Sequence, residues 1–304
     1  MAARLASFLG RYGDGAALLT VLACGVVVVG EAYEAGLAPL RKSRPAEEAT
    51  HYGCSEIISA SNCRALEKEG YVVIDNAFAR VSEARRDVRR MVREKGAMTD
   101  SPNRDSAIRT DLMCFLTETD RAAVRAAMKK AETEDSYVGG SGLLRAQMFL
   151  GGVGAALQSQ SFVGFSGHSK VVKLRVPEQV QLALYTGTKT FYIPHRDGID
   201  KTFWEMGLLE WLRYDCYRRR AVTAILYLTE GEEWDNERDG GFLRLYIGAE
   251  RGDDDGTTAR EVVDISPLGG RMVLFDAQRV LHEVRPTFRE RIGVTVWFTS
   301  TAPS

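Results

Sequence analysis

The amino-acid sequence predicts an α+β protein with a mainly β core of the sandwich or jelly-roll kind. The main observation is a series of short runs after Gly140 that are rich in β-branched and aromatic residues. Glycine-containing turns at Asp239-Gly240-Gly241 and Gly269-Gly270 separate some of these runs. The other observation is helical periodicity before Gly140, which predicts helices that support the β core. The predicted strands are 171–176, 180–185, 222–228, 242–247, 261–265, 272–275 and 292–299.

Three helices and one strand are predicted before Gly140. Ser61 can cap a short helix that ends at Gly70, and residues 71–74 then have the composition of a strand. Asp120 can cap a third helix further along the chain. The apolar faces expected to pack inward are Val81, Ala84, Val88 and Val92 in the second helix, and Val124, Met128 and Ala131 in the third.

Length and charge limit the kinds of protein that the chain can be. It has 304 residues, of which 45% are hydrophobic, so it can bury a large core without disulfides or metals. Lysine and arginine together number 40, and aspartate and glutamate 41, which gives a net charge of −1. Because no overall field attracts the chain to a polyanion, we expect no nucleic-acid partner.

The five cysteines form no CxxC pair and no spacing typical of zinc ligands. They are Cys24, Cys54, Cys63, Cys114 and Cys216. We interpret them as small buried hydrophobic residues. In an oxidising compartment, a bridge between Cys54 and Cys63 is the alternative.

The first 36 residues predict a segment separate from the folded domain. Residues 16–29 are almost wholly apolar and follow Arg4 and Arg11, which resembles a signal sequence or a short membrane anchor. A transit peptide or a buried helix would also fit, so a secretory, membrane-anchored, organellar or cytoplasmic location stays open. Membrane association through residues 16–30 is one candidate. Residues 37–52 are polar and contain two prolines, which predicts a linker, and the folded domain is expected at 53–304.

Two of the four histidines suggest a metal site. Asp197 follows His195 by two positions at the end of a predicted strand, so that the imidazole and the carboxylate can point the same way. His282 lies far along the chain, next to a strand-like segment, and can complete the set from another strand. Two histidines and one carboxylate on one face leave the opposite coordination positions open, the arrangement of iron(II) oxygenases.

The sequence after His282 resembles the C-terminal motif of the prolyl 4-hydroxylases. Residues 282–298 read HEVRPTFRERIGVTVWF, and Arg291 stands nine positions after His282. The likeness is greatest to the oxygen-sensing enzymes that modify hypoxia-inducible factor, in which an arginine at that distance pairs with the distal carboxylate of 2-oxoglutarate. A guanidinium is also chemically suited to a carboxylate, because its planar fork binds both oxygens. The resemblance implies a double-stranded β-helix, a jelly-roll, cupin-like core with N-terminal supporting helices.

The resemblance extends upstream to roughly residue 70 and implies further site residues. The co-substrate would be surrounded by Tyr185, which lies ten positions before His195, and by Tyr227, Thr295 and Arg291. The segment that contains Arg109 and Asp111, together with Arg220, would contact the substrate. The alternative interpretation is core packing for the tyrosines and the threonine, and surface positions or a structural salt bridge for the other three.

One segment departs from the family pattern. Residues 198–219 stand where the oxygen sensors have a short turn, and they contain Phe203, Trp204, Trp211, Tyr214 and Tyr217. The insertion either borders the substrate entrance or forms an added helix, with Trp204, Leu208 and Trp211 on one face, that packs on the core.

The activity that the resemblance implies is iron(II)- and 2-oxoglutarate-dependent dioxygenation of a protein, with peptidyl-proline 4-hydroxylation as the main expectation. The cofactors would be Fe(II), 2-oxoglutarate and O2, with ascorbate as a further candidate. The partner would be a proline-containing polypeptide. Three alternatives stay open: a hydroxylase of secreted hydroxyproline-rich or collagen-like proteins, a non-catalytic cupin-like metal-binding protein, and a zinc hydrolase. The first is disfavoured by Arg291, where such enzymes usually carry lysine.

Overall fold

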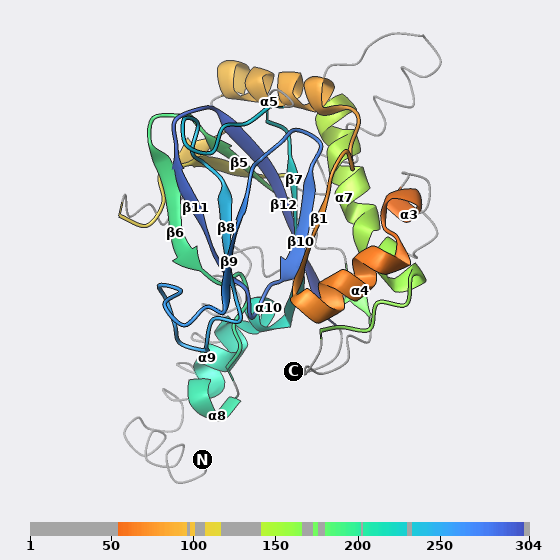
Figure 1. The fold of residues 1–304 in the computed structure, drawn as a ribbon, viewed down its shortest axis with the longest axis vertical. Coiled ribbons are helices and arrows are strands. Elements are labelled where there is room, and N and C mark those ends of the chain that lie inside the picture. Colours follow the sequence, from red (N-terminus) through yellow and green to blue (C-terminus); the bar gives the residue numbers. More distant parts are fainter. Residues whose placement is uncertain are drawn as a thin grey trace, which may run out of the picture. The chain divides into compact units, whose positions relative to one another are not determined.

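Two antiparallel sheets form the centre of the computed structural model, which describes residues 54–95, 98–100, 107–116, 141–165, 173–175, 180–201, 203–229 and 233–300 (Figure 1). The major sheet has the order β1 (Tyr71–Ile74), β10 (Met272–Asp276), β7 (Arg220–Tyr227), β12 (Arg291–Ser300), β5 (Val180–Tyr185), β3 (Leu112–Leu116) and β2 (Thr99–Asp100), and β4 (Leu174–Arg175) pairs with β12. The minor sheet has the order β6 (Thr190–His195), β11 (Leu281–Thr287), β8 (Leu243–Ile247) and β9 (Glu261–Ile265). From β5 to β12 the chain passes repeatedly between the two sheets, as in a jelly roll. The predicted α+β class with a mainly β core is confirmed.

Side-chain alternation gives the major sheet two different apolar faces. On one face, residues of β5, β7 and β12 pack with the helices in a large core: Val180, Leu182, Leu184, Val222, Ala224, Leu226, Ile292, Val294, Val296 and Phe298. On the other face, Ile225, Tyr227 and Phe275 pack with Leu243 and Leu245 of the minor sheet. The second face therefore lies in the space between the sheets, where every second residue of β7 and β12 points.

Helices α3 (Cys54–Ile57), α4 (Ala60–Glu69), α5 (Val81–Lys95) and α7 (Ser141–Ser159) contribute to the first core. In Figure 1, α4 and α7 lie on the side of the major sheet away from β6 and β11. The predicted inward face of α5 is confirmed, since Ala84 and Val88 are fully buried. The predicted cap of α4 is wrong: Ser59, not Ser61, precedes the helix, and its Oγ accepts from the Asn62 amide at 3.2 Å. The predicted end at Gly70 is confirmed by its left-handed φ of 81°.

The sequence analysis missed helix α7. Its central glycines lower helix propensity, and the helix lacks a polar face because it is buried. Tertiary contacts explain both features: the Asp87 carboxylate accepts from the Leu143 amide at 3.0 Å near the start of the helix, and Gly154 lies against Phe298. A Cβ on Gly154 would come within 2.9 Å of the Phe298 ring, so glycine allows the helix to approach the sheet closely.

Other differences concern short elements. β3 and β11 were not predicted as strands, and of β6 only a strand end at His195 was expected; β6 and β11 contain Pro194 and Pro286 and carry polar residues in place of regular alternation. Only Leu174–Arg175 of the strand expected at 171–176 forms a described strand. Residues 1–36, the linker at 37–52 and the helix expected from Asp120 lie outside the described residues.

The described cysteines form no disulfide, which settles the alternative for Cys54 and Cys63. Both are buried free thiols, and the Cys54 Sγ donates to the Phe149 carbonyl at 2.8 Å. Cys114 and Cys216 are partly exposed. Within the described ranges, no helix has both the length and the apolar character needed to cross a membrane.

The insertion forms three short helices. The chain divides into two compact units, and the described part of the smaller unit is Phe203–Asp215. In this unit, α8 (Phe203–Met206) and α9 (Leu208–Arg213) are separated by Gly207. The expectation of one added helix is therefore wrong, and Trp204 is 89% exposed. α10 (Asp215–Arg219) leads into β7.

Candidate metal and co-substrate site

The structure brings His195, Asp197 and His282 together at one end of the minor sheet. His195 is the last residue of β6 and pairs in register with His282 of β11, so the two rings lie 4.3 Å apart between centroids. The Asp197 oxygens lie 3.7 Å from His195 Nε2 and 3.6 Å from His282 Nε2. Each residue offers one ligand atom, and these three atoms lie within 4.8 Å of one another, close enough to share a metal ion.

Hydrogen bonds to the backbone orient both imidazoles. The Nδ1 atoms of His195 and His282 lie 2.8 Å and 3.0 Å from the carbonyl oxygens of Ile193 and Val280. Because a carbonyl oxygen can only accept, each Nδ1 carries a proton, which leaves each Nε2, facing Asp197, as the nitrogen that can bind a metal. Metal ligation requires this tautomer.

The charge states also suit a metal. Desolvation of the imidazole, together with the neighbouring His282, lowers the pKa of His195 to about 3, so the ring is neutral at physiological pH. Burial alone would raise the pKa of Asp197, but His282, His195 and Arg220 hold this pKa below its usual range. Two imidazoles and one carboxylate form the donor set that suits non-haem iron(II).

Aromatic rings hold the two imidazoles in place. Tyr192 stacks on His195 with a centroid distance of 3.7 Å and an angle of 21° between the planes. Phe275 packs on His282 at 4.6 Å. The guanidinium of Arg109 lies 4.4 Å from the centre of the Tyr192 ring on which it rests. The sequence analysis did not single out Tyr192 or Phe275. For Tyr192, the signal in the sequence was an aromatic residue three positions before His195.

Arg291 is a buried cation without a carboxylate partner among the described residues. Its side chain is 2% exposed, its Nη2 donates a long hydrogen bond of 3.4 Å to Tyr227 Oη, and its Nε has no partner there. The guanidinium also lies 4.7 Å from the ring centre of Tyr185 and 5.0 Å from that of Tyr227. A buried charge in a neutral surrounding costs several kcal/mol unless an anion pairs with it, so this position is suited to a carboxylate ligand.

The co-substrate residues expected from the sequence share the space between the sheets with the triad. Tyr185 belongs to one apolar cluster with Val284 of β11, against which Tyr192 of β6 packs, and this cluster connects the surroundings of Arg291 with those of His195. Tyr185 and Tyr227 are buried, and burial raises the pKa of each phenol, so both remain neutral hydrogen-bonding groups. Thr295 is buried on β12 and points to the same side as Arg291, since the two are four residues apart on one strand.

The three residues expected to contact substrate have partners within the protein. Arg109 binds Asp111 through two bonds of 2.7 and 2.6 Å, and both residues are buried. This geometry corresponds to the structural salt bridge that the sequence left open. Arg220 donates to the Asp197 carbonyl at 2.9 Å, and its guanidinium lies between the rings of Tyr217 and Trp297, at 4.3 and 4.1 Å. A substrate contact by these residues stays a prediction.

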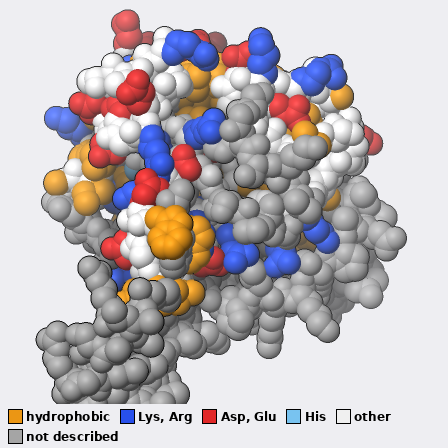
Figure 2. All heavy atoms as spheres, turned by 90° about the horizontal axis from the view of Figure 1, so that it is seen from below, with side chains coloured by type: hydrophobic (Ala, Val, Ile, Leu, Met, Phe, Trp, Pro, Cys, Tyr) orange, Lys and Arg blue, Asp and Glu red, His pale blue; other side chains and the backbone are white. Residues whose placement is uncertain are grey.

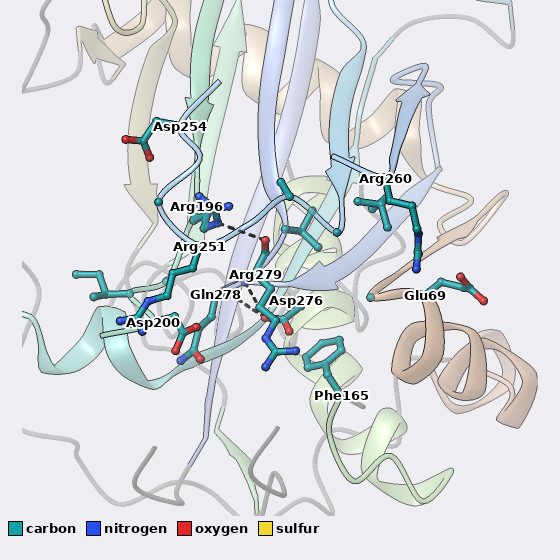
Figure 3. A pocket seen from close by; sticks show the side chains of 18 of the residues that line it. Glu69, Phe165, Arg196, Asp200, Arg251, Asp254, Arg260, Asp276, Gln278 and Arg279 are labelled. Carbon is teal, nitrogen blue, oxygen red and sulfur yellow. Dashed lines mark hydrogen bonds between the residues drawn. The ribbon is translucent and has the colours of Figure 1, made fainter. Parts of the chain in front are cut away.

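A separate cavity of about 750 Å³ lies next to the triad but does not contain it. Arg196, which stands between the two ligands His195 and Asp197, contributes to this cavity, with Asp200, Arg251 and Arg279 among the other lining residues (Figure 3). The Arg196 guanidinium donates to the carbonyls of Glu250, Asp253 and Arg279 at 2.9, 2.8 and 3.3 Å. Arg196 therefore braces the surrounding loops, while its neighbours face the candidate metal. Acidic and basic side chains are interspersed on the described surface seen in Figure 2.

Comparison with known proteins agrees with this geometry. Residues 180–299 match the model of the 2OG-Fe(II) oxygenase superfamily, and these residues hold the His-Asp-His set, Arg291 and all but β1–β4 of the two sheets. The match agrees with the resemblance seen in the sequence.

The particular relatives are prolyl hydroxylases. The chain is 33% identical over 121 residues to a hypoxia-inducible factor prolyl hydroxylase of Caenorhabditis elegans, which covers 40% of this chain and 13% of that protein. It is 28% identical over 127 residues to Egl nine homolog 1 of Homo sapiens, which covers 41% of this chain and 24% of the relative. The match thus spans less than a quarter of the length of either relative.

A solved structure shares the fold over most of the chain. The prolyl hydroxylase of Trichoplax adhaerens, solved in complex with a peptide fragment of the hypoxia-inducible factor oxygen degradation domain, superimposes with a TM-score of 0.54. The alignment covers 85% of this chain and 94% of that chain, at 18% identity. At this identity the likeness establishes the jelly-roll fold alone.

Proposed function

We propose that the protein is an iron(II)- and 2-oxoglutarate-dependent dioxygenase that hydroxylates proline in a polypeptide, with succinate and carbon dioxide as co-products. The observation that carries the proposal is the combination of the His-Asp-His set with the buried, carboxylate-free Arg291 in one space between the sheets. A purely structural metal site would not require a buried arginine that can bind a carboxylate ligand. A hydrolytic zinc site would need a general base, and HExxH does not occur in the sequence.

The residues have separate tasks in this proposal. His195 Nε2, Asp197 and His282 Nε2 would hold the iron, and the Arg291 fork, with Tyr227 Oη, would bind the distal carboxylate of 2-oxoglutarate. Iron(II), 2-oxoglutarate and dioxygen together supply the oxidant that inserts one oxygen atom into an unactivated C–H bond. The protein orients the co-substrate and keeps water out, and the fully buried Tyr227 and Tyr185 contribute to that dry surrounding.

A polypeptide substrate is supported by the names of the relatives, which act on or are bound to hypoxia-inducible factor. In this chain the insertion is the element by which substrate choice could differ. The hydrogen bond from the Ile199 amide to the Tyr217 carbonyl closes the base of the insertion at 3.2 Å, only two residues from Asp197. We therefore propose that the insertion contributes to peptide selection rather than to metal or 2-oxoglutarate binding.

The test is mass spectrometry of proline-containing peptides incubated with the protein, iron(II) and 2-oxoglutarate. The proposal expects addition of one oxygen atom to proline and one succinate for each hydroxylated peptide. His282→Ala should form no product while keeping its circular dichroism spectrum. Full turnover by His282→Ala, or oxidation at a residue other than proline, would contradict the proposal.

A collagen-like peptide should be included, because hydroxylation of secreted hydroxyproline-rich or collagen-like proteins is the second candidate and a signal-like run occupies residues 16–29. Ascorbate is proposed as a reductant that keeps the iron ferrous. A fall in succinate yield per enzyme when ascorbate is omitted would support this role. Membrane association through residues 16–30 rests on their apolar sequence alone.

A further inference from the structure

We infer that Thr223 is a positioning residue that decides how Asp197 ligates the metal, an inference that rests on the proposed function. Thr223 lies on β7, is fully buried, and donates a hydrogen bond of 2.7 Å from its Oγ1 to the Asp197 Oδ2. Its side chain lies in the space between the sheets, on the opposite face of β7 from Val222 and Ala224, which belong to the large core.

This bond distinguishes the two carboxylate oxygens of Asp197. Each oxygen lies near one imidazole, Oδ1 at 3.7 Å from His195 Nε2 and Oδ2 at 3.6 Å from His282 Nε2, but within the described residues only Oδ2 accepts a hydrogen bond from Thr223. The threonine hydroxyl donates this bond, because a carboxylate oxygen can only accept. The Thr223 hydroxyl thus occupies one lone pair of Oδ2, and Oδ1, which has no such donor, is the oxygen that the inference assigns to the metal.

β7 fixes Asp197 at a second atom. The Arg220 Nη1 donates to the Asp197 backbone carbonyl at 2.9 Å, so one end of β7 holds the main chain while Thr223 holds the carboxylate. With the carbonyl and Oδ2 both held, the carboxyl group cannot swing freely toward a position in which both of its oxygens face the metal. Asp197 held in this way would supply one oxygen to the metal.

The count of coordination positions gives this restraint its functional meaning. In an octahedral site, His195, His282 and one oxygen of Asp197 would take three positions, and 2-oxoglutarate would take two more. One position would then remain for dioxygen. A carboxylate that bound through both oxygens would fill it, so the Thr223 hydroxyl keeps the last position open.

The test uses cobalt(II) in place of iron(II), because its visible spectrum reports coordination number without turnover. Thr223→Val keeps the β-branched shape but removes the hydroxyl, and Thr223→Ser keeps the hydroxyl. We expect Thr223→Val to change the cobalt spectrum and to weaken cobalt affinity by about 10- to 100-fold, as is typical when a group that orients a metal ligand is lost. Thr223→Ser should restore both to wild-type values.

A matched control is Thr190→Val on β6, a buried threonine whose hydroxyl has no partner within the described residues. Its cobalt affinity and spectrum should equal those of the wild type. If Thr223→Val does not fold, Thr223→Ala and Thr223→Ser form a second pair that differs only in the hydroxyl oxygen.

Two results would overturn the inference. One is a Thr223→Val or Thr223→Ala variant that is less stable without metal but binds cobalt with unchanged affinity and spectrum, because the hydroxyl would then only satisfy a buried carboxylate. The other is a Thr223→Ser variant that fails to restore the spectrum. Neither result depends on 2-oxoglutarate turnover or on any peptide, so the inference and the proposed function can fail separately.

Discussion

Replacing Arg291 by methionine should separate two effects of this buried cation, its effect on the free energy of unfolding of the ligand-free protein and its effect on 2-oxoglutarate binding. Arg291 is 2% exposed, and its polar contact among the described residues is the 3.4 Å bond to Tyr227 Oη. The faces of Tyr185 and Tyr227 offset part of the desolvation cost, by about 0.5–2 kcal/mol each. Since that cost is several kcal/mol, Arg291→Met should leave the ligand-free protein as stable as the wild type or raise its free energy of unfolding by about 1–2 kcal/mol.

The effect of 2-oxoglutarate should be the reverse. At a concentration of about 100 times its Kd, a ligand that binds only the folded state adds about 2.7 kcal/mol, or roughly 5–10 °C in Tm for a domain of this size. Wild-type protein with manganese(II), which avoids turnover, should show this shift, and Arg291→Met should show none. Arg291→Lys keeps the charge without the fork and should weaken 2-oxoglutarate binding by about 1–3 kcal/mol.

The assay is thermal unfolding with and without 2-oxoglutarate, together with calorimetric titration. Arg244→Met is the matched control, because Arg244 is paired with Asp264 through bonds of 2.7 and 2.8 Å; this variant should keep the full 2-oxoglutarate shift. The reasoning is refuted if Arg291→Met retains the shift. It is also refuted if the ligand-free variant loses more than about 2 kcal/mol, since the guanidinium would then have a strong partner within the protein.

Three further predictions concern the insertion, α7 and a buried thiol. Replacing Phe203–Asp215 by a short glycine-rich turn should leave the Kd of 2-oxoglutarate unchanged. With two unrelated proline peptides, the replacement should raise the KM or change which peptide is preferred. Unchanged peptide kinetics would mean that the insertion serves only as scaffold. Gly154→Ala should lower the free energy of unfolding, measured by urea denaturation, by about 1–2 kcal/mol, because the clash with Phe298 outweighs the gain of about 1 kcal/mol in helix propensity. A variant more stable than the wild type would refute the close approach of the helix to the sheet. Burial raises the pKa of Cys54 to about 12, so in native protein at pH 8 iodoacetamide should label the partly exposed Cys216 but not Cys54, as read by mass spectrometry. Equal labelling of both cysteines would contradict the burial of Cys54. The unfolded thiol ionises from about pH 9 while the folded thiol keeps its proton, so the stability that Cys54 contributes should be lost as the pH rises from 9 toward 12.

The sequence by itself predicted the β core and the residues that gather at the site. Strands such as β5, β7, β10 and β12 are rich in β-branched and aromatic residues because they are buried, and this composition is visible without coordinates. The spacing of His195 and Asp197, and of His282 and Arg291, follows from strand geometry and from the family motif, so it too can be seen in the chain.

The tertiary structure alone decided the features that depend on contacts distant in sequence. α7 is a helix despite its glycines because Phe298 and the buried core require a close approach, and β6 and β11 are strands because they pair with each other, although their proline and polar residues obscure the pattern. Likewise Arg109 and Asp111 are paired with each other inside the protein, which residue types alone left undecided. The bond from Thr223 to Asp197 joins residues 26 positions apart, and no local signal predicts which oxygen a hydroxyl on another strand will hold.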